Sequence, residues 1–172
     1  MKKLMVAVAA VAFGLMANAA TVNWNASGIP AQGTDETPKN YVVYLFDTAA
    51  VSSTDIAAKL ATGDLDLLSK AIGSKKATSK GAVSLGTGSV GYTTEQTFNA
   101  YGVIFNNATA ADATYFAISP TVTSDKVAAS GSVNVALGDC SKVSYAQIAP
   151  EPTSGLLLLL GVAGLALRRR RA

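Results

Sequence analysis

Two residue types that carry much of enzyme chemistry are missing from almost the whole 172-residue chain. Histidine does not occur, and arginine occurs only as Arg168, Arg169, Arg170 and Arg171. Without histidine, neither a His-activated serine or cysteine nucleophile nor a His metal site can be built. Without arginine elsewhere, the rest of the chain cannot recognise phosphate or carboxylate through a bidentate guanidinium. We expect a protein without catalytic activity or cofactor, with a Ser–Lys or carboxylate pair left as catalytic options.

Cysteine is nearly as scarce, since Cys140 is the only one in the chain. A single cysteine excludes a disulfide within the chain. Its neighbours, Gly138-Asp139 and Ser141-Lys142, are typical of a turn between strands. Cys140 either pairs with another molecule or is a small, half-buried residue beside a turn, and we favour the second interpretation.

Charged residues are few, and many of the positive ones lie at the two ends. Lys2 and Lys3 begin the chain and the four arginines end it. Residues 20–149 contain eight lysines and ten acids, a net charge of 8 − 10 = −2. The basic footprint of a nucleic-acid-binding protein is therefore absent from this segment, and we expect no nucleic-acid partner.

Residues 1–19 have the pattern of a secretory signal peptide. Lys2 and Lys3 are followed by an apolar run of 13 residues, 4–16, and by small residues at 17 and 19. A signal peptidase is expected to cut between Ala19 and Ala20. The alternative is an N-terminal membrane helix, but 13 residues span only about 20 Å against roughly 30 Å of bilayer core.

Residues 150–172 contain a second ordered pattern. Pro150, Glu151 and Pro152 precede an apolar run at 155–167, and the four arginines follow it directly. Prolines keep the tripeptide out of a helix. By the positive-inside rule the arginines would stop transfer and remain cytoplasmic, so the rest of the chain would lie outside.

This tail resembles the PEP-CTERM sorting domain of Gram-negative bacteria. The resemblance implies recognition by an exosortase, release from the inner membrane, and delivery to the cell surface or the surrounding matrix, often alongside exopolysaccharide production. The run at 155–167 is short for a lasting membrane span, which favours a transient transmembrane helix. The alternatives are a membrane-tethered periplasmic domain and a buried C-terminal helix.

Residues 20–149 are expected to form one mainly β domain. Short alternating or β-branched stretches separated by turn residues predict an antiparallel β-sandwich or partly open barrel of about six or seven strands. Residues 41–46 are apolar on both faces, which predicts a central strand. The expected strands are 21–24, 41–46, 82–85, 98–105, 114–118, 132–137 and 142–148.

Two short helices interrupt this pattern near 55–72. Thr54 is expected to cap a helix over 55–62, and Asp64 a second helix over 65–72. Residues 29–40 and 74–81 are expected to be loops. The glycines of 86–91 have the spacing of a dinucleotide-binding motif, but no helical pattern follows them, so we expect a hairpin or bulged turn.

Two groups of side chains in this domain could support a function. The acid pairs Asp35–Glu36 and Asp64/Asp66 are the candidates for carboxylate chemistry, although loop solvation and helix capping explain them better. The aromatic residues form either a sugar-stacking platform or part of the core, and core packing is favoured; they are Trp24, Tyr41, Tyr44, Tyr92, Tyr101, Tyr115 and Tyr145. A structural or adhesive surface protein is thus the leading hypothesis, and a small carbohydrate-binding module the alternative.

Overall fold

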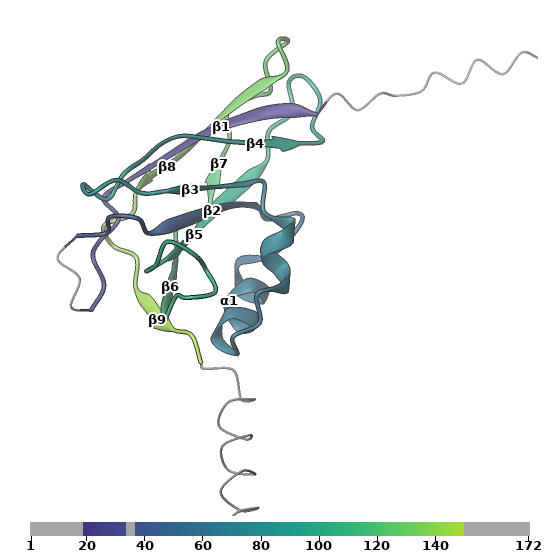
Figure 1. Cartoon of the computed structure of the whole chain (residues 1–172). Coiled ribbons are helices and arrows are strands. Elements are labelled where there is room, and N and C mark those ends of the chain that lie inside the picture. The colour runs from purple at the N-terminus through teal and green to yellow at the C-terminus, as the bar shows by residue number, and fades with distance from the viewer. Residues whose placement is uncertain (1–18, 34–36, 150–172) are drawn as a thin grey trace, which may run out of the picture.

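The computed structural model of the chain describes residues 19–33 and 37–149, and within them the protein is mainly β (Figure 1). The strands form a three-stranded sheet, β4-β1-β8, and a six-stranded sheet in which β3-β2-β5-β6-β9 are neighbours and β7 pairs with β5. The mainly β prediction is confirmed, but six or seven strands were too few for the described part. The nine strands are β1 (Ala20–Ser27), β2 (Val42–Asp47), β3 (Gly73–Lys76), β4 (Val83–Val90), β5 (Asn99–Phe105), β6 (Tyr115–Ile118), β7 (Val122–Thr123), β8 (Ser132–Asp139) and β9 (Tyr145–Gln147).

Strand β1 lies at the centre of the smaller sheet. Its alternation buries Val22, Trp24 and Ala26 on one face and exposes most of the other. It pairs antiparallel with β4 and parallel with β8. A purely antiparallel arrangement was therefore the wrong prediction. A parallel partner needs a long connection, and here most of the larger sheet is formed between β1 and β8.

Strand β2 is internal to the larger sheet, between β3 and β5, as its sequence predicted. Val43 and Leu45 face the smaller sheet and share a core with Val22 and Trp24. Val42 and Phe46 face the opposite side. The larger sheet is thus covered on both faces, which explains why its central strands are apolar throughout.

Helix α1 (Ser53–Ala61) covers the outer face of the larger sheet, the face turned away from the smaller sheet (Figure 1). Ile56 and Leu60 are buried there against Phe46, Tyr101 and other aromatic residues of the sheet. The N-cap is Ser52, whose hydroxyl accepts a hydrogen bond from the Asp55 N–H at 3.0 Å. The predicted cap, Thr54, was two residues too late and lies inside the helix.

The second predicted helix is a short 3₁₀ turn, η1 (Asp66–Lys70). Asp64 accepts a hydrogen bond from the Asp66 N–H at 3.0 Å, so it forms a local turn and not a cap on the helix. Ala71 is already extended, and the Ile72 N–H donates to the Leu45 carbonyl at 2.8 Å. Pairing with β2 therefore begins where the helix was expected to continue.

Two expected irregular segments are strands. Edge strand β3 is formed by Gly73–Lys76, although 74–76 were predicted to be part of a loop. The glycines of 86–91 are not at a turn, because β4 continues through Val90. A Cβ at Gly86 would overlap the Trp24 indole, and one at Gly88 would overlap the Ile72 carbonyl. These glycines allow close approach, while a register shift and a φ of 53° at Leu85 mark a bulge just before them.

Candidate functional site

The predicted sorting residues lie at or beyond the limits of the described domain. Pro150, Glu151, Pro152 and the arginines Arg168, Arg169, Arg170 and Arg171 are outside the described residues, as are the two apolar runs. Between 19 and 149, apart from 34–36, no helix is long and apolar enough to cross a membrane.

The expected signal-peptidase cut lies directly before the first residue of β1. Ala20 is the first residue of β1, is 1% exposed and pairs with Val90. At the other end, the Ala149 N–H donates to the Ala61 carbonyl at 3.3 Å. In Figure 1 the start of β1 and the end of β9 lie at opposite ends of the domain.

Of the two acid pairs, only Asp64/Asp66 lies among the described residues. The Asp64 carboxylate bonds to the Lys59 ammonium, and this hydrogen bond is the first cause that lowers the pKa of Asp64. Asp66 is exposed in η1. Asp35 and Glu36 lie outside the described residues. No cluster of three or more His, Cys, Asp or Glu suitable for a metal ion occurs in 19–33 and 37–149.

The aromatic residues are divided between core and surface. Trp24, Tyr41 and Tyr101 are at most 3% exposed, so core packing is confirmed for them. Tyr44, Tyr92, Tyr115 and Tyr145 are half-buried. Tyr44 packs edge-on against Phe105, Tyr145 packs edge-on against Tyr41, and Tyr92 stacks on Phe98, so each of these three rings packs against another ring of the domain.

Cys140 is fully buried and belongs to the core between the sheets. Its N–H donates to the Ser27 carbonyl at 2.7 Å, and burial is the first cause that raises the pKa of its thiol. The turn was predicted correctly, but the side chain is more buried than expected. Burial on this scale keeps the thiol away from partners in the folded protein.

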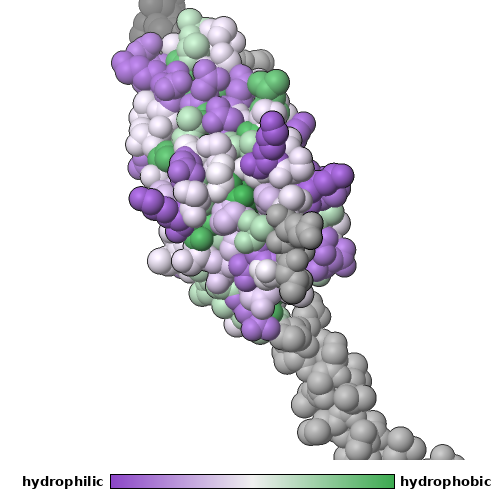
Figure 2. All heavy atoms as spheres, turned by 90° about the vertical axis from the view of Figure 1, so that its left-hand side faces the viewer, coloured by the Kyte–Doolittle hydropathy of each residue, from purple (hydrophilic) through white to green (hydrophobic). Residues whose placement is uncertain are grey.

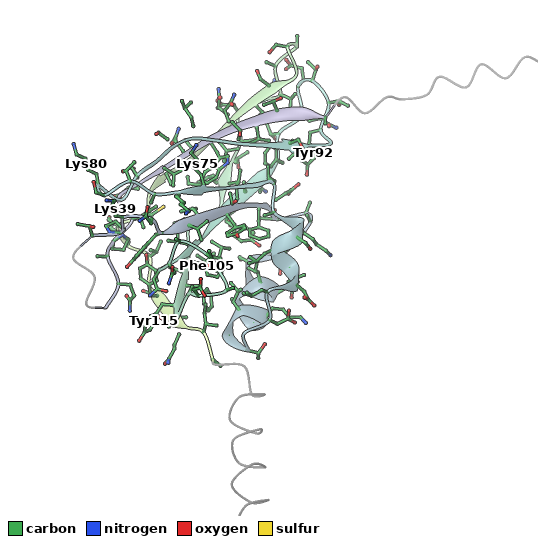
Figure 3. All side chains as sticks on the ribbon, in the orientation of Figure 1. Lys39, Lys75, Lys80, Tyr92, Phe105 and Tyr115 are labelled. Carbon is green, nitrogen blue, oxygen red and sulfur yellow. The ribbon has the colours of Figure 1, made fainter. Side chains whose placement is uncertain are left out.

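A buried acid and a tyrosine meet at one corner of the domain, although no sequence pattern connects them. Asp47, at the end of β2, is 8% exposed. One carboxylate oxygen accepts from the Ala49 N–H at 2.8 Å and the other from the Tyr92 hydroxyl. The Tyr92 ring stacks on Phe98, with ring centres 5.0 Å apart. Since Tyr92 follows β4, this hydrogen bond ties the two sheets together (Figure 3).

The electrostatics of this pair do not suit acid–base catalysis. The hydrogen bond to Asp47, followed by desolvation, raises the pKa of Tyr92 to about 12. A general acid or base is most effective with a pKa near the working pH. The pair borders a hollow of about 340 Å³, which Lys70 and Ser89 also line. The Tyr92–Asp47 hydrogen bond is suited to a structural role, in which it links the two sheets.

A second hollow, which we call the outer groove, lies on the outer face of the larger sheet. It has a volume of about 500 Å³. Its lining residues come from β2, β3 and the loop between β5 and β6: Val42, Tyr44, Ser74, Lys75, Lys76, Ala108 and Thr109. Sequence reasoning missed this groove because its residues are brought together by strand pairing between β2 and β3.

The register of β2 and β3 determines which side chains share the groove. Tyr44 lies opposite Ser74, and Val42 lies opposite Lys76. Directly opposed residues of an antiparallel pair project from the same face of the sheet. The Tyr44 ring, the Ser74 hydroxyl and the Lys76 ammonium are therefore available on one face, which can accommodate a ligand with both ring-like and anionic parts.

Comparison of the chain with protein-family models, with curated proteins and with solved structures gave no match.

Proposed function

We propose that this chain is an exported protein, sorted by an exosortase to the cell surface or extracellular matrix, with a structural or adhesive role and no catalytic activity. The observation that carries the proposal is the order of segments in the sequence: a signal peptide at 1–19, a domain at 20–149, then Pro150-Glu151-Pro152, an apolar run and four arginines. Each end is a membrane-targeting signal, and the two are consistent with one export route.

The contacts of the residues at the two ends of the described part support this division. Ala20 is already buried in β1, and Ala149 still donates a backbone hydrogen bond. Cuts at 19/20 and beyond 149 would therefore remove both signals without taking a residue from any strand or helix of the domain. We infer that the product is a β-sandwich of the two sheets, with α1 and η1 as a third layer.

The short distance between domain and apolar run bears on how an exosortase would reach its site. Five residues, 150–154, separate Ala149 from the run that starts at Gly155. Even fully extended they span only about 17 Å. The enzyme would therefore work close to the end of the domain formed by Gly63, Leu65, Ala110, Ala111 and Ala113, whose side chains are small or apolar.

A tripeptide replacement in the native host tests the proposal. With Pro150→Ala, Glu151→Ala and Pro152→Ala combined, we expect full-length protein to accumulate in the membrane fraction. A matched control, Thr153→Ala with Ser154→Ala, alters neighbouring residues outside the tripeptide and should be processed like the wild type. Equal surface delivery of the tripeptide variant would contradict exosortase sorting and favour a membrane-tethered periplasmic domain.

A further inference from the structure

We propose that the outer groove binds an acidic polysaccharide, that is, a polymer whose sugar units carry carboxylates. This inference goes beyond the export and sorting proposed above, because it concerns only residues 42–109 of the folded domain. The volume of the groove, about 500 Å³, lies within the range of small-ligand sites. The ligand class follows from three properties of its lining.

The first property is an aromatic ring with unused polar capacity. Tyr44 is half-buried, and Phe105 supports its ring edge-on, with centres 5.7 Å apart. Neither the Tyr44 hydroxyl nor the adjacent Ser74 hydroxyl makes a hydrogen bond within the described part of the chain. A tyrosine offers both an apolar ring and a polar hydroxyl, which suits a sugar with its apolar ring hydrogens and many hydroxyls.

The second property is a positive charge that no acid among the described residues neutralises. Lys75 and Lys76 are exposed, and the salt bridges among the described residues are made by other lysines, Lys59 and Lys126. No carboxylate of the described residues lines the groove. Lys76 projects from the same face as Tyr44, whereas Lys75 lies opposite Val43, whose side chain faces the smaller sheet. Lys39 and Lys80 are on the left in Figure 3, toward the Lys76 end of β3, and do not line the groove.

The third property is that one side of the groove, the loop with Ala108 and Thr109, is held in place by hydrogen bonds within the domain. The loop that carries Ala108 and Thr109 is held against β2 by a hydrogen bond from the Val42 N–H to the Asn107 carbonyl at 2.9 Å. The Asn107 amide donates across the loop to the Asp112 carbonyl at 3.0 Å. The Asp112 carboxylate accepts from the Thr109 hydroxyl and does not line the groove. A preformed wall reduces the entropy lost on binding.

Other ligand classes fit these properties less well. Nucleic acid would need a longer basic footprint than the lysines of this one region provide. A protein partner would need a larger apolar surface, whereas Figure 2, which shows the side of the molecule where Lys39 and Lys80 lie, has only small separate hydrophobic areas. Lysines on an edge strand also prevent strand addition. Protection of the edge strand requires no tyrosine beside the lysines, so the presence of Tyr44 favours a ligand-binding site over protection alone.

Affinity electrophoresis of the full chain in a non-ionic detergent tests the proposal, with polygalacturonate in the gel as the acidic polysaccharide and dextran as the neutral one. We expect polygalacturonate to slow the wild type and dextran to leave its mobility unchanged. Lys76→Gln should weaken the apparent affinity about threefold, as expected for one solvent-exposed charge contact. Lys76 is exposed, so this variant should fold normally.

The matched control is Lys70→Gln, which removes the same charge away from the groove and should bind like the wild type. Equal weakening by both variants would overturn the proposal, because binding would then follow net charge. Equal retardation by dextran, or tighter binding of double-stranded DNA than of polygalacturonate, would overturn it as well. Any of these results would leave the proposed sorting intact, since sorting depends on the ends of the chain.

Discussion

Replacing Tyr92 with phenylalanine should destabilise the domain by removing one hydrogen bond to a buried carboxylate. Asp47 is 8% exposed and accepts only from the Tyr92 hydroxyl and the Ala49 N–H among side-chain hydrogen bonds of the described residues. The phenylalanine ring can keep its stack on Phe98, so the loss is confined to the hydroxyl. Hydrogen bonds to charged groups contribute about 1.5–3 kcal/mol, and we expect a loss of about 2 kcal/mol.

Urea unfolding followed by tryptophan fluorescence measures this loss. Trp24 is the only tryptophan and is 1% exposed in β1, so its emission reports the opening of the core between the sheets. With an m-value of about 2 kcal/mol/M, the midpoint should fall by about 1 M. Tyr115→Phe is the control, because the Tyr115 hydroxyl makes no hydrogen bond within the described part of the chain and should shift the midpoint little.

The same variant has a signature at high pH. The pKa of Tyr92 is raised to about 12 in the folded protein, against about 10 in an unfolded chain. The folded state therefore favours the protonated phenol, and this contribution is complete below pH 10 and is lost between pH 10 and about 12. Burial also raises the pKa of Tyr101 to about 12, so the wild type loses both contributions in this window. The Tyr92→Phe protein should lose stability less steeply there.

Two results would refute this reasoning. A midpoint within about 0.2 M of the wild type would mean that the Tyr92–Asp47 hydrogen bond contributes less than about 0.5 kcal/mol. An unchanged slope of stability between pH 10 and 12 would mean that Tyr92 does not titrate with a raised pKa in the folded protein.

Three further predictions concern the helix cap, a glycine in β4 and the buried thiol. Ser52→Ala should cost about 1 kcal/mol in urea unfolding because α1 loses its cap, whereas Thr54→Ala should cost clearly less; the reverse order would contradict the cap assignment. Gly86→Ala should cost more than about 2 kcal/mol because its Cβ would overlap the indole, whereas Gly91→Ala has open space and is the control; equal effects would refute the close approach. Cys140 should react with a thiol reagent only as fast as the domain unfolds, and rapid labelling of the native protein would contradict its burial.

Local sequence patterns predicted the strands and the helix in which one or both faces are buried. The alternation at 21–24 gave β1, although the strand is longer, and the run at 41–46 gave an internal strand with both faces covered. Helix α1 followed from the spacing of Ile56 and Leu60. In each case the apolar residues of the buried face recur at a regular spacing in the sequence. This spacing can be recognised without knowing which element covers the face.

The errors have a common physical cause, because they concern segments whose structure is decided by distant parts of the chain. Gly73–Lys76 has no apolar period, and it becomes a strand because it pairs with β2. The glycines of β4 resemble a turn, but they are required by Trp24 and Ile72, which approach them closely. The outer groove depends on the register that places Ser74 opposite Tyr44. No local pattern encodes such pairings.

The mass of the mature protein, recovered from membrane and surface fractions of the native host, tests the central claim most directly. We predict a species that begins at Ala20 and ends between Pro150 and Thr153, found in the surface fraction. A species in the membrane fraction that retains Arg168, Arg169, Arg170 and Arg171 would contradict exosortase processing. The chain would then be a membrane-tethered periplasmic domain.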